Sequence, residues 1–262
     1  MGAPDNIDAY APREIAKRVE AAGIAKANLP TLQTLMLGLL AGAFIAFGAI
    51  LYTVVVTNSG LGFGPERLLG GVAFSLGLIL VLVGGAELFT GNNLIVFAWV
   101  DKKIPLKALL RNWGLVYVGN LLGALATAVA IHLSGITAMA DGAVQETLLR
   151  IADGKLSLSV DKAFIRAILC NVLVCLAVWL NFSARSVAGK VLVIVFPIAG
   201  FVALGFEHSI ANMFFLPAGW LAGSDLADVS GVVLNIFVVT LGNIIGGGAL
   251  VAWVYWIVYG RN

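Results

Sequence analysis

Two related stretches, GAELFTGNN at residues 85–93 and GFEHSIANM at residues 205–213, decide how this chain folds. Each lies inside an apolar run, 68–100 or 191–224, in which one glutamate is the only residue with a full charge. A straight helix over either run would be on the order of 50 Å long, whereas the hydrocarbon core of a bilayer is about 30 Å thick. We therefore predict that each run forms one membrane segment of two half-helices, with a break at the glutamate.

The two halves of the chain match at further positions, which indicates an internal repeat. Four other charge-free runs, 27–65, 112–140, 167–184 and 229–260, are each long enough for one crossing helix. Three segments per repeat is an odd number, so the second copy enters the membrane in the opposite direction. The matched pairs are Gly85/Gly205, Glu87/Glu207 and Asn92/Asn212, 120 positions apart, and Asn112/Asn235, Gly119/Gly242, Asn120/Asn243 and Gly123/Gly246, 123 positions apart.

These segments predict an all-α polytopic membrane protein with six transmembrane segments, an inverted 3+3 repeat in which segments 2 and 5 are broken. The repeats cover about 31–133 and 160–260, inside one membrane domain at 31–260. Glycines four positions apart, such as Gly119 and Gly123, allow close contact between helices. Paired broken helices place a substrate path near the middle of the membrane, between the repeats.

The composition supports this class and argues against others. Hydrophobic residues make up 60% of the chain and charged residues 11%, and the mean hydropathy is +1.00. In soluble domains about 45–50% of the residues are apolar and about 25% are charged. A net charge of +2 provides no basic face for nucleic acid. The two cysteines and two histidines have no metal-ligand spacing and no catalytic motif is present, so we expect no metal, no cofactor and no enzyme.

The N-terminal residues 1–30 are charged, and residues 12–28 space their apolar side chains as in an amphipathic surface helix. We expect this helix on the cytoplasmic face. The alternative is that it only covers the cytosolic end of the protein and has no functional role. With the N-terminus inside, 11 of the 16 lysines and arginines lie on the cytoplasmic side, and both termini are cytoplasmic. The longest external loop is then about 134–162, with Lys155 near its end.

Residues that break the repeat symmetry are the main functional candidates. His208 aligns with Leu88, and Thr90 aligns with Ile210. Ionisable side chains inside a membrane are functional by default, and histidine changes charge near neutral pH. Thr90 offers a hydroxyl opposite His208 if the repeats face one another; the alternative is that it bonds its own backbone.

Residues that obey the symmetry are expected to hold the breaks together. Glu87 and Glu207 can accept hydrogen bonds from N–H groups freed at the breaks, with Asn212 beside them; proton or substrate handling is the alternative. Asn171 is a further polar candidate, and Lys155 taken alone is a solvated loop charge. Five apolar residues around the breaks form either constrictions or plain helix packing: Leu78, Leu88, Phe89, Val174 and Phe201.

Six stretches, spread over essentially the whole chain, resemble the formate/nitrite transporter family. They are YAPREIA (10–16), AGIAKANLP (22–30), ELFTGNN (87–93), ILCNVLVCLAVWL (168–180), GFEHSIANMFFLPAG (205–219) and LGNIIGGG (241–248). The resemblance implies an aquaporin-like fold and a homopentamer with one pore in each protomer. It also implies that Thr90 and His208 lie at the central pore site and that Lys155 lowers the barrier for incoming anions. Family pore and constriction positions correspond to Asn171, Leu78, Leu88, Phe89, Val174 and Phe201.

Residues and resemblance together predict a channel or transporter for small monovalent anions in a bacterial-type inner (plasma) membrane. The GNN that follows Thr90 is closest to the formate-type subgroup, so formate is the favoured substrate, with transient protonation near His208. Formate or a similar anion, a proton and the lipid bilayer are the expected partners.

Other functions stay open at this point. Nitrite, hydrosulfide or another short monoacid is the alternative substrate. A non-transporting scaffold or sensor that uses residues 1–30 is disfavoured, because irregular backbone at membrane depth is tolerated only where it is buried or lines a cavity. Water or glycerol conduction is disfavoured because both breaks lack an Asn-Pro-Ala sequence.

Overall fold

The computed structural model describes residues 8–261, and within that part of the chain all regular elements are helices. In chain order the α-helices are α1 (Pro12–Ala27), α2 (Thr31–Val56), α3 (Phe63–Gly84), α4 (Val96–Val100), α5 (Leu106–Leu133), α6 (Ala143–Leu156), α7 (Val160–Ser183), α8 (Val187–Ala203), α9 (Ser209–Leu221) and α10 (Val229–Ile244). Short 3₁₀ turns, η1 (Gly91–Ile95) and η2 (Ile136–Ala138), precede α4 and α6. Beyond α10 the chain continues in π-helical turns, η3 (Ile245–Trp253) and η4 (Trp256–Gly260).

Within the described residues, five helices are long and apolar enough to cross a bilayer: α2, α3, α5, α7 and the continuous helix from Val229 to Gly260. The η1–α4 pair, α8 and α9 are shorter apolar helices. Two half-helices were predicted for each broken segment, and this prediction is wrong for α3, because its 22 residues are enough to cross a bilayer. The helix begins at Phe63, and Glu66 and Arg67 lie in its first turns. Charged side chains are tolerated there because, at a helix end, they can reach the interface between membrane and water.

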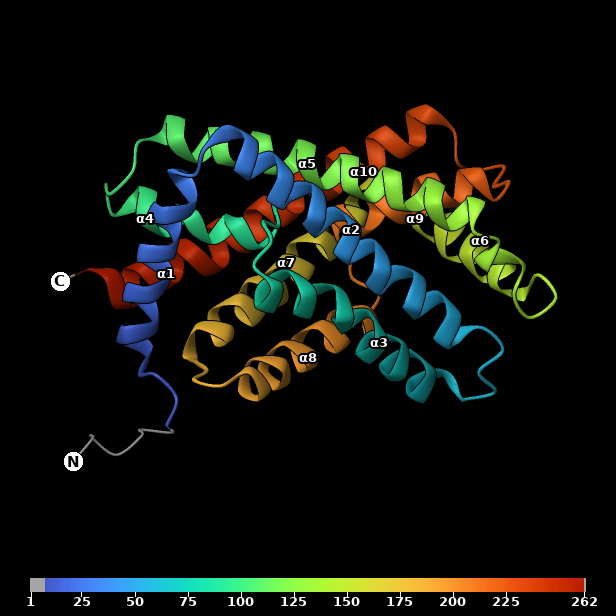
Figure 1. Cartoon of the computed structure of the whole chain (residues 1–262), viewed down its shortest axis with the longest axis horizontal. Helices are drawn as coiled ribbons and strands as arrows, with labels where there is room; N and C mark the ends of the chain where they lie inside the picture. Colours follow the sequence, from blue (N-terminus) through green and yellow to red (C-terminus); the bar gives the residue numbers. More distant parts are fainter. Residues whose placement is uncertain (1–7, 262) are drawn as a thin grey trace.

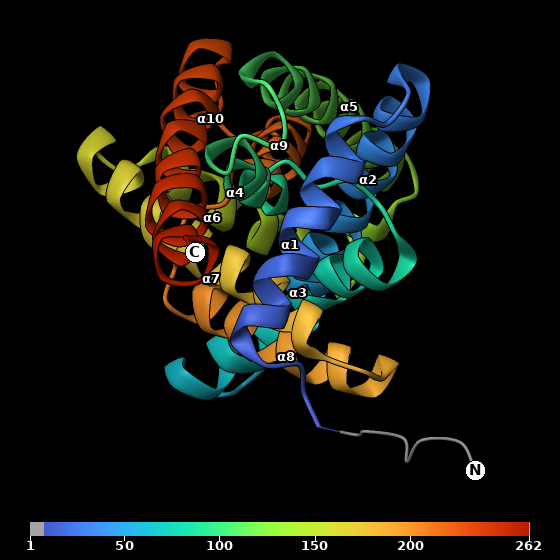
Figure 2. The same ribbon diagram turned by 90° about the vertical axis from the view of Figure 1, so that its left-hand side faces the viewer.

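The long helices run roughly along the longest axis of the molecule, with α1 and the C-terminus at one end and α6 at the other (Figure 1). We call these ends the α1 side and the α6 side. Figure 2 looks onto the α1 side, where α1 lies across the end of the bundle. The apolar face of α1, which includes Ile15, Val19 and Gly23, is buried against η1, α4, α7 and η4, and its polar face is exposed.

Glycines let α2 and α5 pack backbone against backbone. A Cβ on Gly42 would collide with the carbonyl oxygen of Asn120, and a Cβ on Gly123 would collide with that of Leu39. In the second half of the chain, a Cβ on Gly246 would collide in the same way with the backbone of α7. Gly123 and Gly246, which are matched in the repeat, therefore set the spacing of the corresponding helix pairs in both halves.

A glycine in the left-handed region follows the first half of each broken segment. Gly85 follows α3 with φ of 86°, and Gly205 lies just after α8 with φ of 70°. Residues with a Cβ rarely adopt this conformation. The chain leaves the helix at these glycines and resumes helical turns at η1 and α9, so the breaks enclose Glu87 and Glu207.

Candidate conduction site

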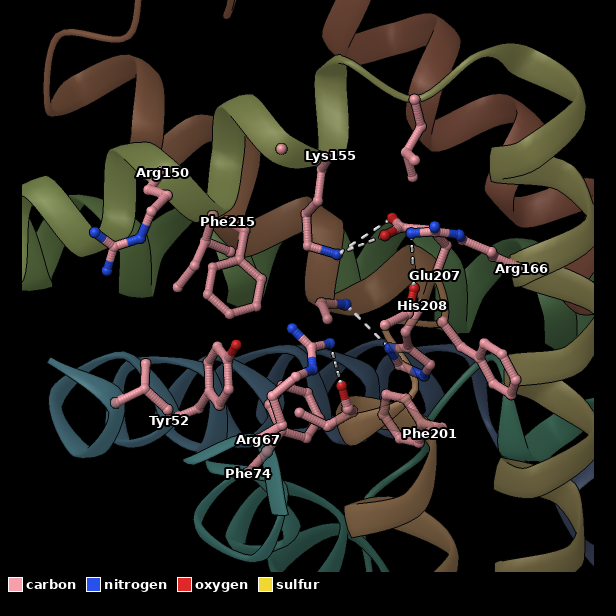
Figure 3. Close-up of a pocket in the computed structure, with 18 of the residues that line it drawn as sticks. Tyr52, Arg67, Phe74, Arg150, Lys155, Arg166, Phe201, Glu207, His208 and Phe215 are labelled. Atoms are coloured by element: carbon pink, nitrogen blue, oxygen red, sulfur yellow. Dashed lines mark hydrogen bonds and ion pairs between the residues drawn. The ribbon is translucent and has the colours of Figure 1, made fainter. Parts of the chain in front are cut away.

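A buried hydrogen bond between Thr90 and His208 joins the two breaks. Thr90 Oγ1 lies 2.9 Å from His208 Nε2, and both side chains are buried. His208 is also the N-cap of α9, where its Nδ1 accepts a hydrogen bond of 3.1 Å from the backbone N–H of Ala211 (Figure 3). Because Nδ1 accepts, we assign the ring proton to Nε2, which then donates to Thr90 Oγ1. His208 is therefore a neutral hydrogen-bond donor in this arrangement.

The carboxylate of Glu207 is bound by side chains on the α6 side. Lys155 Nζ lies 3.1 and 3.2 Å from its two oxygens, and Asn212 Nδ2 donates to it at 2.7 Å. Asn212 Nδ2 also donates to Asn235 Oδ1 at 2.8 Å, and Asn235 Nδ2 donates to the carbonyl oxygen of Lys155 at 3.2 Å. This ring of contacts fixes both partners of a buried ion pair.

The same ring is repeated on the α1 side. Lys26 Nζ lies 2.6 Å from Glu87 Oε1, and Asn92 Nδ2 donates to Glu87 Oε2 at 2.7 Å. Asn92 Nδ2 also donates to Asn112 Oδ1 at 3.0 Å, and Asn112 Nδ2 donates to the carbonyl oxygen of Lys26 at 3.0 Å. Sequence reasoning missed Lys26. The signal that could have found it is a lysine ahead of the first long helix in each half of the chain.

The backbone groups freed at the breaks are bound by asparagines of the neighbouring helices. Asn120 accepts from Phe89 N–H at 2.9 Å and donates to the Glu87 carbonyl at 2.9 Å. Asn243 accepts from Ser209 N–H at 2.9 Å and donates to the Glu207 carbonyl at 3.0 Å. The expectation that the two glutamate carboxylates bind these N–H groups is therefore wrong, because amide side chains pair with N–H and C=O together.

Two pockets approach the Thr90–His208 pair from opposite ends. The α6-side pocket has a volume of about 350 Å³, and Lys155, Glu207 and His208 are among the residues that line it. The α1-side pocket, of about 300 Å³, includes Lys26 and Glu87 in its lining. Each pocket therefore holds one of the two partly buried lysine–glutamate pairs.

Buried apolar side chains form part of the lining of both pockets. Leu78 and Leu88 line the α1-side pocket. Phe74 and Phe201 line the α6-side pocket, and the Phe201 ring stacks on His208 with centroids 5.9 Å apart. Phe74 was not predicted, because a phenylalanine inside an apolar run gives no signal of its own.

The other predicted pore residues lie away from the two pockets. Asn171 Nδ2 donates to the Thr90 carbonyl at 3.2 Å and to Asn93 Oδ1 at 2.8 Å. Phe89 packs edge-on against the aromatic rings of α5, and Val174 is buried in the core. Within the described residues none of these three predicted side chains lines either pocket. Their contact with substrate stays a prediction.

Lys155 belongs to a helix and not to an open loop. The stretch 134–162 contains α6, and Lys155 lies in its last turn. The amphipathic helix packs against α9 and buries Val144 and Leu148, which explains why a polar connection can be helical. The helix holds Lys155 over the α6-side pocket, where the side chain extends toward Glu207 (Figure 3).

Replacing Glu207 with glutamine is expected to destabilise the protein by about 1–2 kcal/mol, because it leaves the Lys155 ammonium without its counter-charge in a largely buried position. Thermal unfolding of the purified protein measures this. The double variant Lys155→Met with Glu207→Gln should recover part of the loss, as expected for coupled groups. Glu66→Gln, in the same pocket but outside the ring of contacts, is the control. Equal losses in E207Q and E66Q would contradict the ion-pair argument.

Two charged pockets that converge on a buried polar pair, inside an apolar bundle with broken helices, define a membrane conduit. A family model described as formate/nitrite transporter matches residues 13–257, and the chain belongs to this family. It is 41% identical to "Formate channel FocA" of Escherichia coli (strain K12), over 100% of this chain and 99% of that protein. It is 45% identical to "Uncharacterized transporter YrhG" of Bacillus subtilis (strain 168), over 96% and 94%.

Solved structures agree with this assignment. One described as "Pentameric formate channel with formate bound" matches with a TM-score of 0.80 at 40% identity, over 88% of this chain and 98% of that chain. Another, described as "FNT family ion channel", matches with a TM-score of 0.86 at 27% identity, over 94% and 98%. The chain therefore has the fold of this channel family and is an integral membrane protein.

Proposed function

We propose that this protein conducts small monovalent anions and that formate is the favoured substrate. The observation that carries the proposal is the pair of lysine-containing pockets, separated by an apolar region in which Thr90 and His208 are hydrogen-bonded. The relatives named as formate channels, from Escherichia coli and from Bacillus thuringiensis, support formate as the substrate.

The lysines make each pocket attractive to an anion. Lys155 and Lys26 each carry three N–H donors, and the paired glutamate does not use all of them. Lys190 adds a further cation to the lining of the α1-side pocket. A small anion can therefore leave bulk water and still be bound by charge-assisted hydrogen bonds.

The apolar region between the pockets selects the neutral form of the substrate. A naked charge between Leu88 and Phe201 would lose its hydration without a full replacement, whereas a neutral acid would lose far less. A lysine beside formate favours the charged form, so protonation follows when the anion leaves the lysine and loses water. Formate takes up a proton from the water of the pocket at this step, the bulk solution supplies the replacement proton, and the substrate crosses as formic acid.

The Thr90–His208 pair provides hydrogen bonds in the apolar region between the pockets without adding a charge. The Nε2–H of the neutral His208 is donated to Thr90 Oγ1, and the Thr90 hydroxyl can in turn donate to a permeating acid. Close to this pair, Ser209 Oγ and Asn171 Oδ1 are buried without a hydrogen-bond partner among the described residues. Both oxygens could therefore accept a further hydrogen bond close to the Thr90–His208 pair.

The direct test is uptake into proteoliposomes that contain the purified protein, with formate and nitrite offered in parallel and the internal pH recorded. Formic acid dissociates after it crosses, so formate uptake should be the faster and should acidify the interior in proportion. Protein-free liposomes give the background for formic acid that crosses lipid. Faster nitrite uptake would contradict formate as the preferred substrate. Formate current without acidification would contradict crossing as the neutral acid.

We further propose a homopentamer in a bacterial-type inner (plasma) membrane, with α1 and both termini in the cytoplasm. The pentamer is supported by the related structure described as pentameric. The orientation is supported by charge, because 11 of the 16 lysines and arginines lie on the α1 side. In this orientation the α6-side pocket opens to the exterior.

A further inference from the structure

Two arginines from different helices meet in the α6-side pocket at the bend of the second break. Arg67 extends from α3 and Arg166 from α7, and both guanidinium groups point toward the region around Glu207 and His208 (Figure 3). A Cβ placed on Gly205 would lie 3.0 Å from Arg67 Nη2 and 3.8 Å from Arg166 Nη1. The absence of a side chain at Gly205 therefore leaves room for two like charges next to each other.

Both guanidinium groups are bound to neutral partners only. Arg67 donates to the carbonyl oxygens of Ala203 and Val202 at 2.6 and 2.9 Å, and Arg166 donates to that of Gly205 at 3.3 Å. Within residues 8–261, neither arginine forms an ion pair with a carboxylate. A guanidinium carries five N–H donors, so both have donors left for another acceptor.

The charges of the pocket are not balanced by its own carboxylates. The lining of the pocket contains four cationic side chains but only two carboxylates. One of these carboxylates, Glu207, is already engaged by Lys155, and the other, Glu66, accepts from Ser59 Oγ. Partly buried like charges repel each other, and an anion held between them would relieve this repulsion.

The repeat shows that the fold does not require an arginine at position 166. The backbone carbonyl of Arg166 accepts from Glu207 N–H at 3.3 Å, and the carbonyl of Leu37 accepts from Glu87 N–H at 3.2 Å. These two residues therefore occupy equivalent places at the two breaks. A leucine makes the same backbone contact on the α1 side, so the guanidinium of Arg166 is not needed to hold the break.

We propose that Arg67 and Arg166 form an anion-binding site in the α6-side pocket, distinct from the Thr90–His208 pair, that takes a small planar oxyanion such as a monocarboxylate or nitrite. Guanidinium donors lie in a fixed plane and match two oxygens of one anion, whereas a halide cannot use this geometry. Because Arg67 also donates hydrogen bonds to carbonyl oxygens at the end of α8, replacing it would disturb the fold as well as the site. Arg166 is therefore the residue whose change tests ligand binding most cleanly. That the oxyanion is a transported one, formate, rests on the proposed function.

The test uses the full-length protein with Arg166→Leu, the residue found at the equivalent position of the first repeat. Lys162→Leu is the matched control, because Lys162 lies on the same helix, is exposed and lies outside the pocket lining. Binding of ¹³C-labelled formate to the purified protein, followed by saturation-transfer NMR, should weaken roughly five- to tenfold in R166L, the loss expected for a partly exposed charged hydrogen bond. K162L should bind as the unchanged protein does.

Formate uptake in right-side-out and inverted membrane vesicles adds a readout that a merely structural role would not move. R166L should raise the half-saturation concentration when formate is offered on the α6 side and leave it unchanged on the α1 side. Arg166→Lys keeps the charge but not the planar donors, so it should bind formate more weakly while chloride competition is unchanged. If R166K binds formate as tightly as the unchanged protein does, the planar donors are not needed. Binding would then depend on positive charge alone, and the proposed oxyanion site would be wrong.

Failure of this site and failure of the proposed function give different results. If R166L and K162L behave alike in formate binding and in uptake, the arginine site is wrong while formate conduction stands. If R166L weakens binding but the unchanged protein does not transport formate, the binding site stands and the proposed function is wrong.

Discussion

Replacing Gly123 with alanine is expected to destabilise the protein by about 3 kcal/mol, the upper end of what overpacking usually costs. The added Cβ would collide with the carbonyl oxygen of Leu39 and would lie 3.0 Å from the backbone nitrogen of Ala43. Both atoms belong to the backbone of α2 and cannot swing aside as a side chain could. The helices α2 and α5 would have to separate, which would also pull Asn120 away from the break that it holds.

Thermal unfolding of the purified protein in detergent measures this effect, and Gly114→Ala is the matched control. Gly114 lies on the same helix, and a Cβ there meets no atom within 4 Å. Because alanine is the better helix former, G114A should be neutral or stabilising by up to about 1 kcal/mol. Equal melting temperatures of G123A and G114A would show that backbone contact between α2 and α5 does not set the helix spacing.

The main features of the fold could be predicted because the membrane leaves few alternatives. The apolar runs, the single glutamate in each of two long runs and the matched glycines predicted broken helices at the positions where Gly85 and Gly205 turn the chain. The helix α6 was missed because its amphipathic pattern lies between polar turns, and a length criterion suited to membrane spans passes over a helix of 14 residues.

The centre of the site could also be predicted, whereas its supporting contacts could not. Thr90 and His208 depart from the repeat symmetry, and the structure brings them within 2.9 Å. Asn120 and Asn243 were matched in the sequence, but side-chain pairing with a freed backbone depends on where two helices cross, which a pattern of residues does not specify. Lys26 was missed for a similar reason, because its partner Glu87 lies 61 positions away.

Replacing His208 with asparagine is expected to lower formate uptake about 100-fold, as when one preorganised donor is removed from a water-excluded site. Asparagine is among the best N-cap residues, so it can accept from the backbone N–H groups at the start of α9 and keep the break in place. It cannot reproduce the Nε2–H that the imidazole directs at Thr90. The variant therefore removes the hydrogen bond to Thr90 without removing the N-cap of α9.

The pH dependence of the remaining uptake separates two roles for His208. If the substrate crosses as formic acid and His208 is a neutral donor, uptake by H208N should still rise toward low pH, because the fraction of formic acid rises. His132→Asn changes the exposed histidine near the end of α5 and should leave both the rate and the pH profile unchanged. An unchanged rate with a lost pH dependence in H208N would identify His208 as a pH-sensing gate. An unchanged rate and profile would remove it from the conduction path.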